Sequence, residues 1–198
     1  MFSGIVYCRA RVKAIRASGS GKVVELAAEK QLVNPEKGMS IAVNGVCLTA
    51  ASFKAKNTFA ADVSAETLSR TTLKGLMPAH QVNIELPLTA DRFLSGHIVQ
   101  GHVDTTGRVE SLKREKGNTL LTVSYPSGYN KYLVEKGSIA VDGVSLTAYN
   151  TGNGVFTVAV IPETLENTIM NGYKKGTAVN LEFDIIGKYV IKQVENLK

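Results

Sequence analysis

The apolar residues of this chain fall in short segments rich in Val, Ile and Thr, separated by Gly, Asn and Pro. In the first half these segments are 22–28, 40–53, 58–64 and 82–88. In the second half they are 119–125, 138–149, 155–161 and 179–185. Segments of this length and composition are typical of antiparallel strands. The pattern therefore predicts an all-β fold, a barrel or sandwich, rather than alternating strands and helices.

The second half of the chain repeats the first. SIAVNGVCLTA from Ser40 returns as SIAVDGVSLTA from Ser138, with nine of eleven letters unchanged and an offset of 98. VNIE from Val82 returns as VNLE from Val179, at an offset of 97. A unit this long exceeds the ~20–50 residues of stacking repeats, so each copy can bury a core by itself. We predict two tandem homologous β-barrels, 1–96 and 97–186, with a linker at about 89–97.

The tail, 187–198, predicts a short helix. Apolar residues recur there at helical spacing on one face, and they are Ile186, Val190, Val194 and Leu197. A helix of about twelve residues is marginal by itself, so its apolar stripe needs a partner. Two alternatives stay open, namely docking on the second barrel and association with the same tail in other subunits.

Composition excludes several classes of protein. The 198 residues are 44% hydrophobic and 20% charged, which is ordinary for a globular protein. No apolar run approaches the ~20 residues of a membrane helix, and the first residues lack signal-peptide order, so we expect a cytoplasmic protein. Cys8 and Cys47 fit no metal motif and are expected to be reduced. The net charge of +6 is spread singly along a chain without tryptophan, which disfavours nucleic-acid binding.

Polar residues recur at matching places in the two copies. Cys47 with Thr49, and Ser145 with Thr147, share one face of a strand because side chains alternate. The alternative is a pair of satisfied polar groups inside a barrel end. His102 follows Gly101 in GHVD, where glycine lets the backbone approach a ligand, although no zinc spacing, G-x-S-x-G elbow or phosphate-binding loop accompanies it.

The ETL segments, 66–68 and 163–165, place a carboxylate and a hydroxyl near expected helical turns, and a further turn is expected over 129–135. Helix capping is one interpretation of these segments. Binding of a polyhydroxyl group by Asp62 and Thr67 is the other.

Several motifs in order resemble the riboflavin synthase family over essentially the whole chain. They are MFSGIV at the start, SGHIVQGHVD from Ser95, the paired GVCLT and DGVSLT, and IPETLENT from Ile161. The resemblance implies six-stranded Greek-key barrels, each holding one 6,7-dimethyl-8-ribityllumazine, in a homotrimer gathered by its C-terminal helices. Facing barrels would belong to different subunits. The implied reaction is the last step of riboflavin biosynthesis, with no cofactor and no metal, and association with lumazine synthase is a further expectation.

The resemblance also implies the site. The pocket of the first barrel would consist of Gly4, Ile5, Val6, Ser40, Cys47, Leu48, Thr49, Asp62, Val63, Ser64, Ala65, Glu66 and Thr67. The pocket of the second barrel would consist of Gly101, His102, Val103, Lys136, Ser145, Leu146, Thr147, Ile161, Pro162, Glu163, Thr164, Leu165 and Glu166.

Roles follow from the same resemblance. Acid–base work falls to His102 and the Ser145–Thr147 pair, with Asp142 orienting them. Cys47 or Ser145 is the candidate nucleophile, with water as the alternative, and a purely hydrogen-bonding role for these two side chains also stays open. Phe2 would pack beside a ring, and Asp184 would support the hydrogen-bond network. A competing class is a non-catalytic protein that binds a lumazine or flavin on the same fold.

Overall fold

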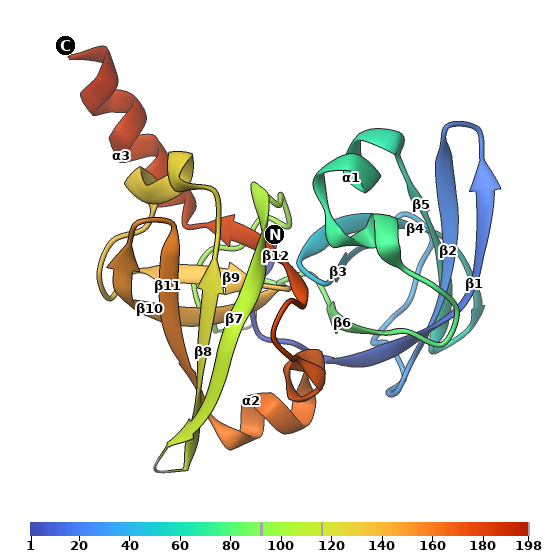
Figure 1. Cartoon of the computed structure of the whole chain (residues 1–198). Coiled ribbons are helices and arrows are strands. Elements are labelled where there is room, and N and C mark those ends of the chain that lie inside the picture. Colours follow the sequence, from blue (N-terminus) through green and yellow to red (C-terminus); the bar gives the residue numbers. More distant parts are fainter. Residues whose placement is uncertain (92, 116, 198) are drawn as a thin grey trace.

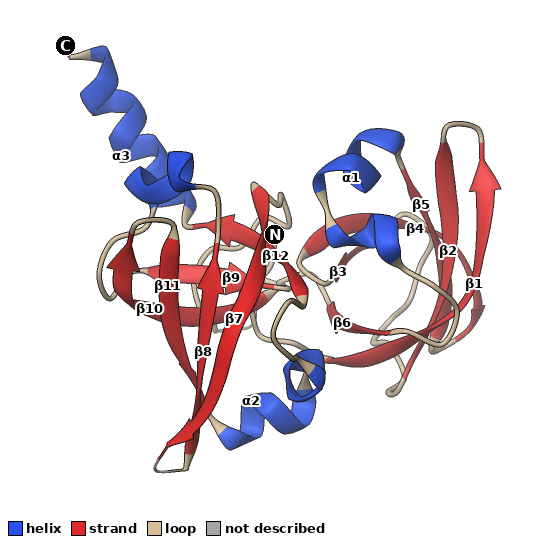
Figure 2. Ribbon diagram, viewed as in Figure 1, coloured by secondary structure: helices blue, strands red, loops and turns tan. Residues whose placement is uncertain are grey.

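The computed structural model describes residues 1–91, 93–115 and 117–197. Its strands form two closed six-stranded barrels that lie side by side, and a helix projects from the second (Figure 1; Figure 2). The predicted all-β fold of two tandem barrels is confirmed. The predicted linker, 89–97, runs without helix or strand in its described residues. Arg92, within that linker, and Lys198, at the end of the predicted tail helix, lie outside the described residues.

The two barrels are built from equivalent elements. The first has β1 (Cys8–Ser18), β2 (Gly21–Ala28), β3 (Ser40–Val43), β4 (Val46–Ala55), β5 (Thr58–Val63), α1 (Ala65–Arg70), η1 (Thr72–Gly75) and β6 (Gln81–Glu85). The second has β7 (Thr105–Glu115), β8 (Asn118–Ser124), η2 (Ser127–Tyr132), β9 (Ser138–Val141), β10 (Val144–Gly152), β11 (Val155–Val160), α2 (Pro162–Asn167), η3 (Ile169–Gly172) and β12 (Ala178–Phe183). Around the first barrel the order is β1-β2-β5-β4-β3-β6, and the second barrel repeats it. Each barrel has its own core, in which Phe59 and its counterpart Phe156 are fully buried.

The repeated segments 40–53 and 138–149 are hairpins rather than single strands. Asn44 and Gly45 have φ of 46° and 73°, and Asp142 and Gly143 have φ of 44° and 80°. Two consecutive residues with positive φ are typical of the type I′ turn, whose twist matches that of the strands it joins. Each segment therefore folds back on itself, which places Cys47 and Ser145 next to the turn, on β4 and β10.

The helix α3 (Ile185–Asn196) begins two residues before the predicted 187. Asp184 caps it, because its Oδ1 accepts a hydrogen bond of 2.9 Å from the Ile186 N–H. The apolar stripe is exposed: Ile186 by 58%, Val190 by 55%, Val194 by 48% and Leu197 by 87%. Docking of this stripe on the second barrel is therefore not what the structure shows. No described helix is long and apolar enough to span a membrane.

The two barrels meet through a pseudo-symmetric interface. Its apolar part consists of Phe2, Ala42, Val99 and Ala140. Phe2 is 0% exposed and lies between the barrels, and its packing beside a bound ring stays a prediction. Its ring fills the space between the barrels, where an aromatic side chain contributes the most buried apolar area.

Two asparagines complete this interface by crossing from one barrel to the other. Asn83 Nδ2 donates to the Asp142 carbonyl at 2.9 Å, and Asn180 Nδ2 donates to the Asn44 carbonyl at 2.8 Å. The amide oxygen of Asn83 accepts from the Ile169 N–H at 2.8 Å, and that of Asn180 accepts from the Thr72 N–H, also at 2.8 Å. Each buried amide is thus satisfied across the interface, which fixes the relative position of the barrels.

One position of this interface carries a carboxyl group in only one copy. Asp142 accepts hydrogen bonds from the Asn180 N–H at 2.8 Å and from the Tyr173 hydroxyl at 2.5 Å. In the first barrel Asn44 stands there and accepts from the Asn83 N–H at 2.7 Å. Asp142 therefore belongs to the interface, and among the described residues its carboxylate hydrogen-bonds to neither His102 nor Ser145. The expected role of Asp142 in orienting these two residues stays a prediction. Burial raises the pKa of Asp142 to about 7, because the two hydrogen bonds offset only part of the desolvation.

Asp142 should make stability depend on pH. Its pKa is about 7 in the folded protein and 3.8 in the reference state, so between these values the folded state binds more protons. The free energy of unfolding then falls as pH rises, by up to about 1.4 kcal/mol per pH unit. We expect Asp142→Asn to remove this contribution to the pH dependence of the free energy of unfolding. Urea unfolding measured between about pH 4 and about pH 7 tests it.

The control is Tyr173→Phe, which keeps the carboxyl group and should keep the slope. Parallel pH profiles for the wild type and Asp142→Asn would contradict the assignment.

Candidate functional site

Two of the cavities formed by the described residues contain predicted catalytic side chains. The first pocket, of about 190 Å³, is lined by Val46, Cys47, Glu66, Thr67, Arg70, Thr71, Gly101, His102 and Val103. The second pocket, of about 680 Å³, is lined by Ile5, Ser95, Gly96, Lys136, Ser138, Ser145, Leu146, Thr147, Tyr149, Ala159, Ile161 and Thr164. Among the described residues the two pockets share no lining residue.

Each pocket takes part of its wall from a segment that precedes the other barrel. The first arm, residues 2–6, precedes the first barrel, yet the Gly4 carbonyl accepts from the Ser145 N–H at 2.8 Å. The second arm, residues 99–103, precedes the second barrel, yet the Gly101 carbonyl accepts from the Cys47 N–H at 2.8 Å. The expectation that the first arm belongs to the first pocket and the second arm to the second is therefore wrong, because the arms are exchanged.

Glycine is required where each arm crosses. Gly4 has a φ of +78° and Gly101 a φ of +80°, a region that side chains disfavour. A Cβ on Gly4 would lie 2.5 Å from the Ser145 Cβ, and a Cβ on Gly101 would lie 2.5 Å from the Cys47 Cβ. The arms can approach these two residues only because no side chain intervenes.

Ser145 has a histidine partner that sequence reasoning missed. The Nδ1 atom of His97 lies 2.7 Å from the Ser145 Oγ, and the His97 ring is buried. Burial lowers the pKa of His97, opposed by the charge of Asp184, so the imidazole is neutral near neutral pH. Its Nε2 has no hydrogen-bond partner among the described residues. The pair can move a proton at the Ser145 hydroxyl.

The glycine before His97 was the available sequence signal. A Cβ on Gly96 would lie 2.1 Å from the Ser3 carbonyl oxygen, so only glycine lets the linker pass between the first arm and Ser145. The motif SGHIVQGHVD contains both His97 and His102, and its glycines precede both of them.

The predicted catalytic residues divide between the pockets. Cys47 and the exposed His102 face the first pocket, whereas Ser145 and Thr147 line the second, so His102 and Ser145 are not joined within one chain. Asp184 caps α3, and its charge raises the pKa of His97, while its support of a wider hydrogen-bond network stays a prediction.

The predicted binding residues are brought together in part. Those that line the two pockets are Ile5, Cys47, Glu66, Thr67, Gly101, His102, Val103, Lys136, Ser145, Leu146, Thr147, Ile161 and Thr164. The remainder are not among the lining residues of either pocket, and they are Gly4, Val6, Ser40, Leu48, Thr49, Asp62, Val63, Ser64, Ala65, Pro162, Glu163, Leu165 and Glu166. Leu48 and Val63 belong to the barrel core. Ser64, which precedes the segment 66–68, caps α1, since its Oγ accepts from the Thr67 N–H at 3.1 Å, while Glu66 and Thr67 lie inside the helix.

The described residues contain no group of three or more His, Cys, Asp or Glu side chains that could hold a metal ion. The polar groups of the pockets are instead hydroxyls, a thiol, an imidazole and backbone atoms, together with the exposed side chains of Lys136, Arg70 and Glu66. Such groups suit a neutral ligand with many hydrogen-bonding atoms.

Known proteins resemble this chain over almost its whole length. The family described as the lumazine binding domain matches twice, at residues 3–87 and 100–184. A riboflavin synthase of Actinobacillus pleuropneumoniae is 41% identical over 190 residues, which cover 96% of this chain and 88% of the relative. A riboflavin synthase of Mycobacterium tuberculosis is 40% identical, with 96% of each chain covered.

Solved structures show the same fold. LumP complexed with 6,7-dimethyl-8-(1'-D-ribityl) lumazine has a TM-score of 0.82 at 21% identity, and covers 92% of this chain and 99% of its own. LumP complexed with riboflavin has a TM-score of 0.85 at 21% identity, with the same coverage.

The crossing of the arms should be sensitive to a single methyl group. We expect Gly101→Ala to destabilise the protein in two ways: about 1–2 kcal/mol from the positive φ, and about 1–3 kcal/mol more from the clash with Cys47. Urea unfolding measures the sum.

Gly176→Ala is the matched control, because its φ is +87° and no heavy atom lies within 4 Å of the added Cβ. Equal losses of stability in the two variants would show that the close approach to Cys47 is not a constraint.

Proposed function

The chain belongs to the riboflavin synthase family, and from this membership we propose that it converts two molecules of 6,7-dimethyl-8-ribityllumazine into riboflavin and 5-amino-6-(ribitylamino)uracil. In this dismutation a four-carbon unit passes from one lumazine to the other. The observation that carries the proposal is the 41% identity over 96% of the chain with a riboflavin synthase.

The duplicated pocket supports a reaction between two copies of one compound. Donor and acceptor begin as identical molecules. Two similar sites therefore suit them better than two unrelated sites would. LumP, which has the same fold, is complexed with a ribityllumazine and, in another structure, with riboflavin. We assign one lumazine to each pocket.

The active site is proposed to form between subunits. Within one chain the two pockets share no described lining residue, so their ligands are held apart. The first pocket of one subunit would face the second pocket of its neighbour. Figure 1 shows α3 projecting from the second barrel away from the first, and its exposed apolar stripe is suited to gather three subunits. A homotrimer makes the two lumazines neighbours. A cytoplasmic location and an association with lumazine synthase stay predictions.

The proposed reaction depends on proton transfer and on the addition of a nucleophile. One lumazine must lose a proton from its 7-methyl group, and the other must accept a nucleophile at C7. Holding the two rings together recovers about 7–11 kcal/mol of the barrier, because the encounter becomes effectively unimolecular. In the second pocket the neutral His97 can accept a proton through the Ser145 hydroxyl at 2.7 Å. In the first pocket Cys47 and His102 are the groups placed for the complementary step.

The alternative is a protein that binds a lumazine or flavin without converting it. The structures of LumP favour it, since they share the fold and hold these ligands. They are 21% identical to this chain, however, against 36–41% for the riboflavin synthases. The enzyme is therefore the better assignment.

Purified protein mixed with 6,7-dimethyl-8-ribityllumazine should form riboflavin, followed by its absorbance, whereas a binder would change ligand fluorescence without consuming the lumazine. We expect Ser145→Ala and His97→Gln each to lower kcat about 10²- to 10⁴-fold, the usual contribution of a general base. The dissociation constant for lumazine should change little, because the pair acts on the reacting atoms.

His80→Gln is the control, since His80 is exposed and lines neither pocket. Cys47→Ser tests the thiol separately. Near-native turnover in both Ser145→Ala and His97→Gln would remove this pair from the mechanism.

The trimer has its own test. The double variant Val190→Asp/Val194→Asp places charge on the exposed stripe of α3 and should weaken association by at least about 100-fold, or about 2.7 kcal/mol. Sedimentation equilibrium would show smaller species, and turnover should fall with them. Lys192→Gln, on the same helix but outside the stripe, should leave both unchanged. An active monomer would refute the shared site.

A further inference from the structure

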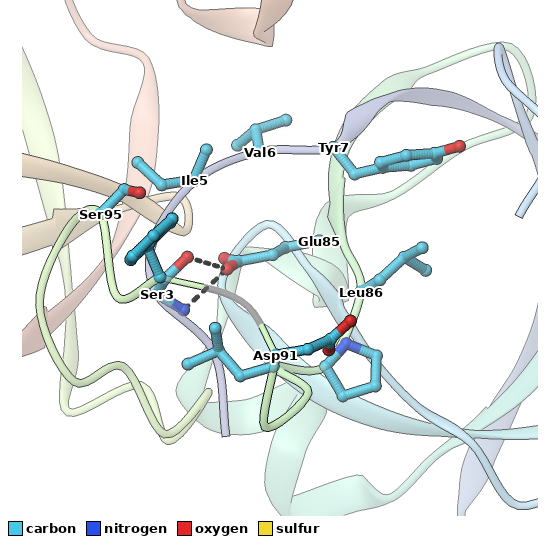
Figure 3. Close-up of a pocket in the computed structure, with 11 residues that line it drawn as sticks. Ser3, Ile5, Val6, Tyr7, Glu85, Leu86, Asp91 and Ser95 are labelled. Carbon is cyan, nitrogen blue, oxygen red and sulfur yellow. Dashed lines mark hydrogen bonds between the residues drawn. The ribbon is translucent and has the colours of Figure 1, made fainter. Parts of the chain in front are cut away.

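Two buried glutamates hold the two arms in place. Glu85 ends β6 and is 5% exposed, and Glu182 lies on β12, is 3% exposed and stands 97 positions later. Glu85 Oε1 accepts from the Ser3 N–H at 2.7 Å and from the Ser3 hydroxyl at 2.9 Å (Figure 3). Both of its carboxylate oxygens also lie 3.1 Å from the Gly4 nitrogen. Glu182 accepts from the Gln100 N–H at 2.6 Å and from the Gly101 N–H at 2.9 Å.

Each carboxylate and its arm depend on one another. Burial raises the pKa of Glu85 and of Glu182, while the hydrogen bonds from the arms oppose that shift. A buried carboxylate is tolerated only where donors satisfy it, and the backbone N–H groups of the arms need an acceptor in return. The arms make these bonds at Gly4 and Gly101, which contact Ser145 and Cys47, and at the residues just before them.

The exchange of the arms gives each glutamate a remote target. Glu85 belongs to the wall of the first barrel, but the Gly4 it binds contacts Ser145 of the second pocket. Glu182 belongs to the second barrel, but the Gly101 it binds contacts Cys47 of the first pocket. One residue separates each carboxylate from the pocket it reaches.

We propose that Glu85 and Glu182 are positioning residues for the pocket of the opposite barrel. Glu85 sets the first arm against Ser145, and Glu182 sets the second arm against Cys47. The inference deepens the proposed function, since it rests on these pockets being the reaction site. It differs from a purely structural role, in which each glutamate would affect its own barrel most.

Thiol reactivity can measure each pocket separately in the full-length protein. Cys47 reports on the first pocket in the native sequence, because Cys8 is buried. In a Cys47→Ser background, the thiol introduced by Ser145→Cys reports on the second. Alkylation rates with iodoacetamide need neither lumazine nor turnover. A failure of the proposed function and a failure of the positioning role are therefore distinguishable.

Glu182→Gln should change the alkylation rate at the first-pocket thiol about fivefold or more, and Glu85→Gln should leave it nearly unchanged. At the second-pocket thiol the order should be reversed. Glu110→Gln, an exposed glutamate outside both pockets, is the control for both reporters.

The proposal would be overturned by any of three results. The alkylation rate could change more in the pocket of a glutamate's own barrel, change equally in both pockets, or change in neither. If either glutamine variant fails to fold, Glu85→Asp and Glu182→Asp take its place, because the shorter side chain keeps the charge but moves it away from the arm. Each aspartate variant should then change the alkylation rate mainly in the pocket of the opposite barrel.

Discussion

Two backbone hydrogen bonds, from Ser145 to Gly4 and from Cys47 to Gly101, determine the architecture of this molecule. Each one ties the segment that leads into one barrel to the pocket of the other. They require glycine at both crossings, and they bring the turns at Gly45 and Gly143 into close approach. The asparagines of β6 and β12 and the buried Phe2 occupy the space that this exchange creates. The barrels therefore form one unit although each has its own core.

The symmetry of the scaffold does not extend to its chemistry. Ser145 has a buried histidine beside it, whereas Cys47 lies next to the exposed His102. The interface carries an ionisable carboxyl at Asp142, where the first copy has the neutral Asn44. Such differences allow two nearly identical sites to treat two identical molecules differently, which a reaction between a donor and an acceptor of the same kind requires.

Much of the fold could be predicted, because strand composition is local and an unusually long repeat is visible in the letters. The hairpins at Asn44-Gly45 and Asp142-Gly143 were also predictable, since these dipeptides favour type I′ turns, yet the apolar runs around them suggested single strands. The strands β1 and β7 were not identified, because their apolar residues are interspersed with Lys and Arg.

The site was less accessible to sequence reasoning. The residue types around Cys47 and Ser145 pointed to the right strands, but nothing local shows that an arm crosses to another barrel. Phe2 and Asp142 suggested ligand chemistry and proved to be interface residues, because burial depends on what packs against them from far along the chain. His97 gained its role only from the linker that carries it past Ser145.

The exchange of arms also has a consequence for biosynthesis. A ribosome adding about 5–20 residues per second completes the first barrel several seconds before the second barrel. Until then the first arm, residues 2–6, lacks the surface of the second barrel against which it packs in the complete chain. The apolar patch around Phe2 and Ala42 is exposed to water during this time. Two such halves from neighbouring ribosomes present complementary surfaces to each other. The short linker at 89–97 disfavours such intermolecular association, because it keeps the second barrel of the same chain at a far higher local concentration than a barrel of another chain.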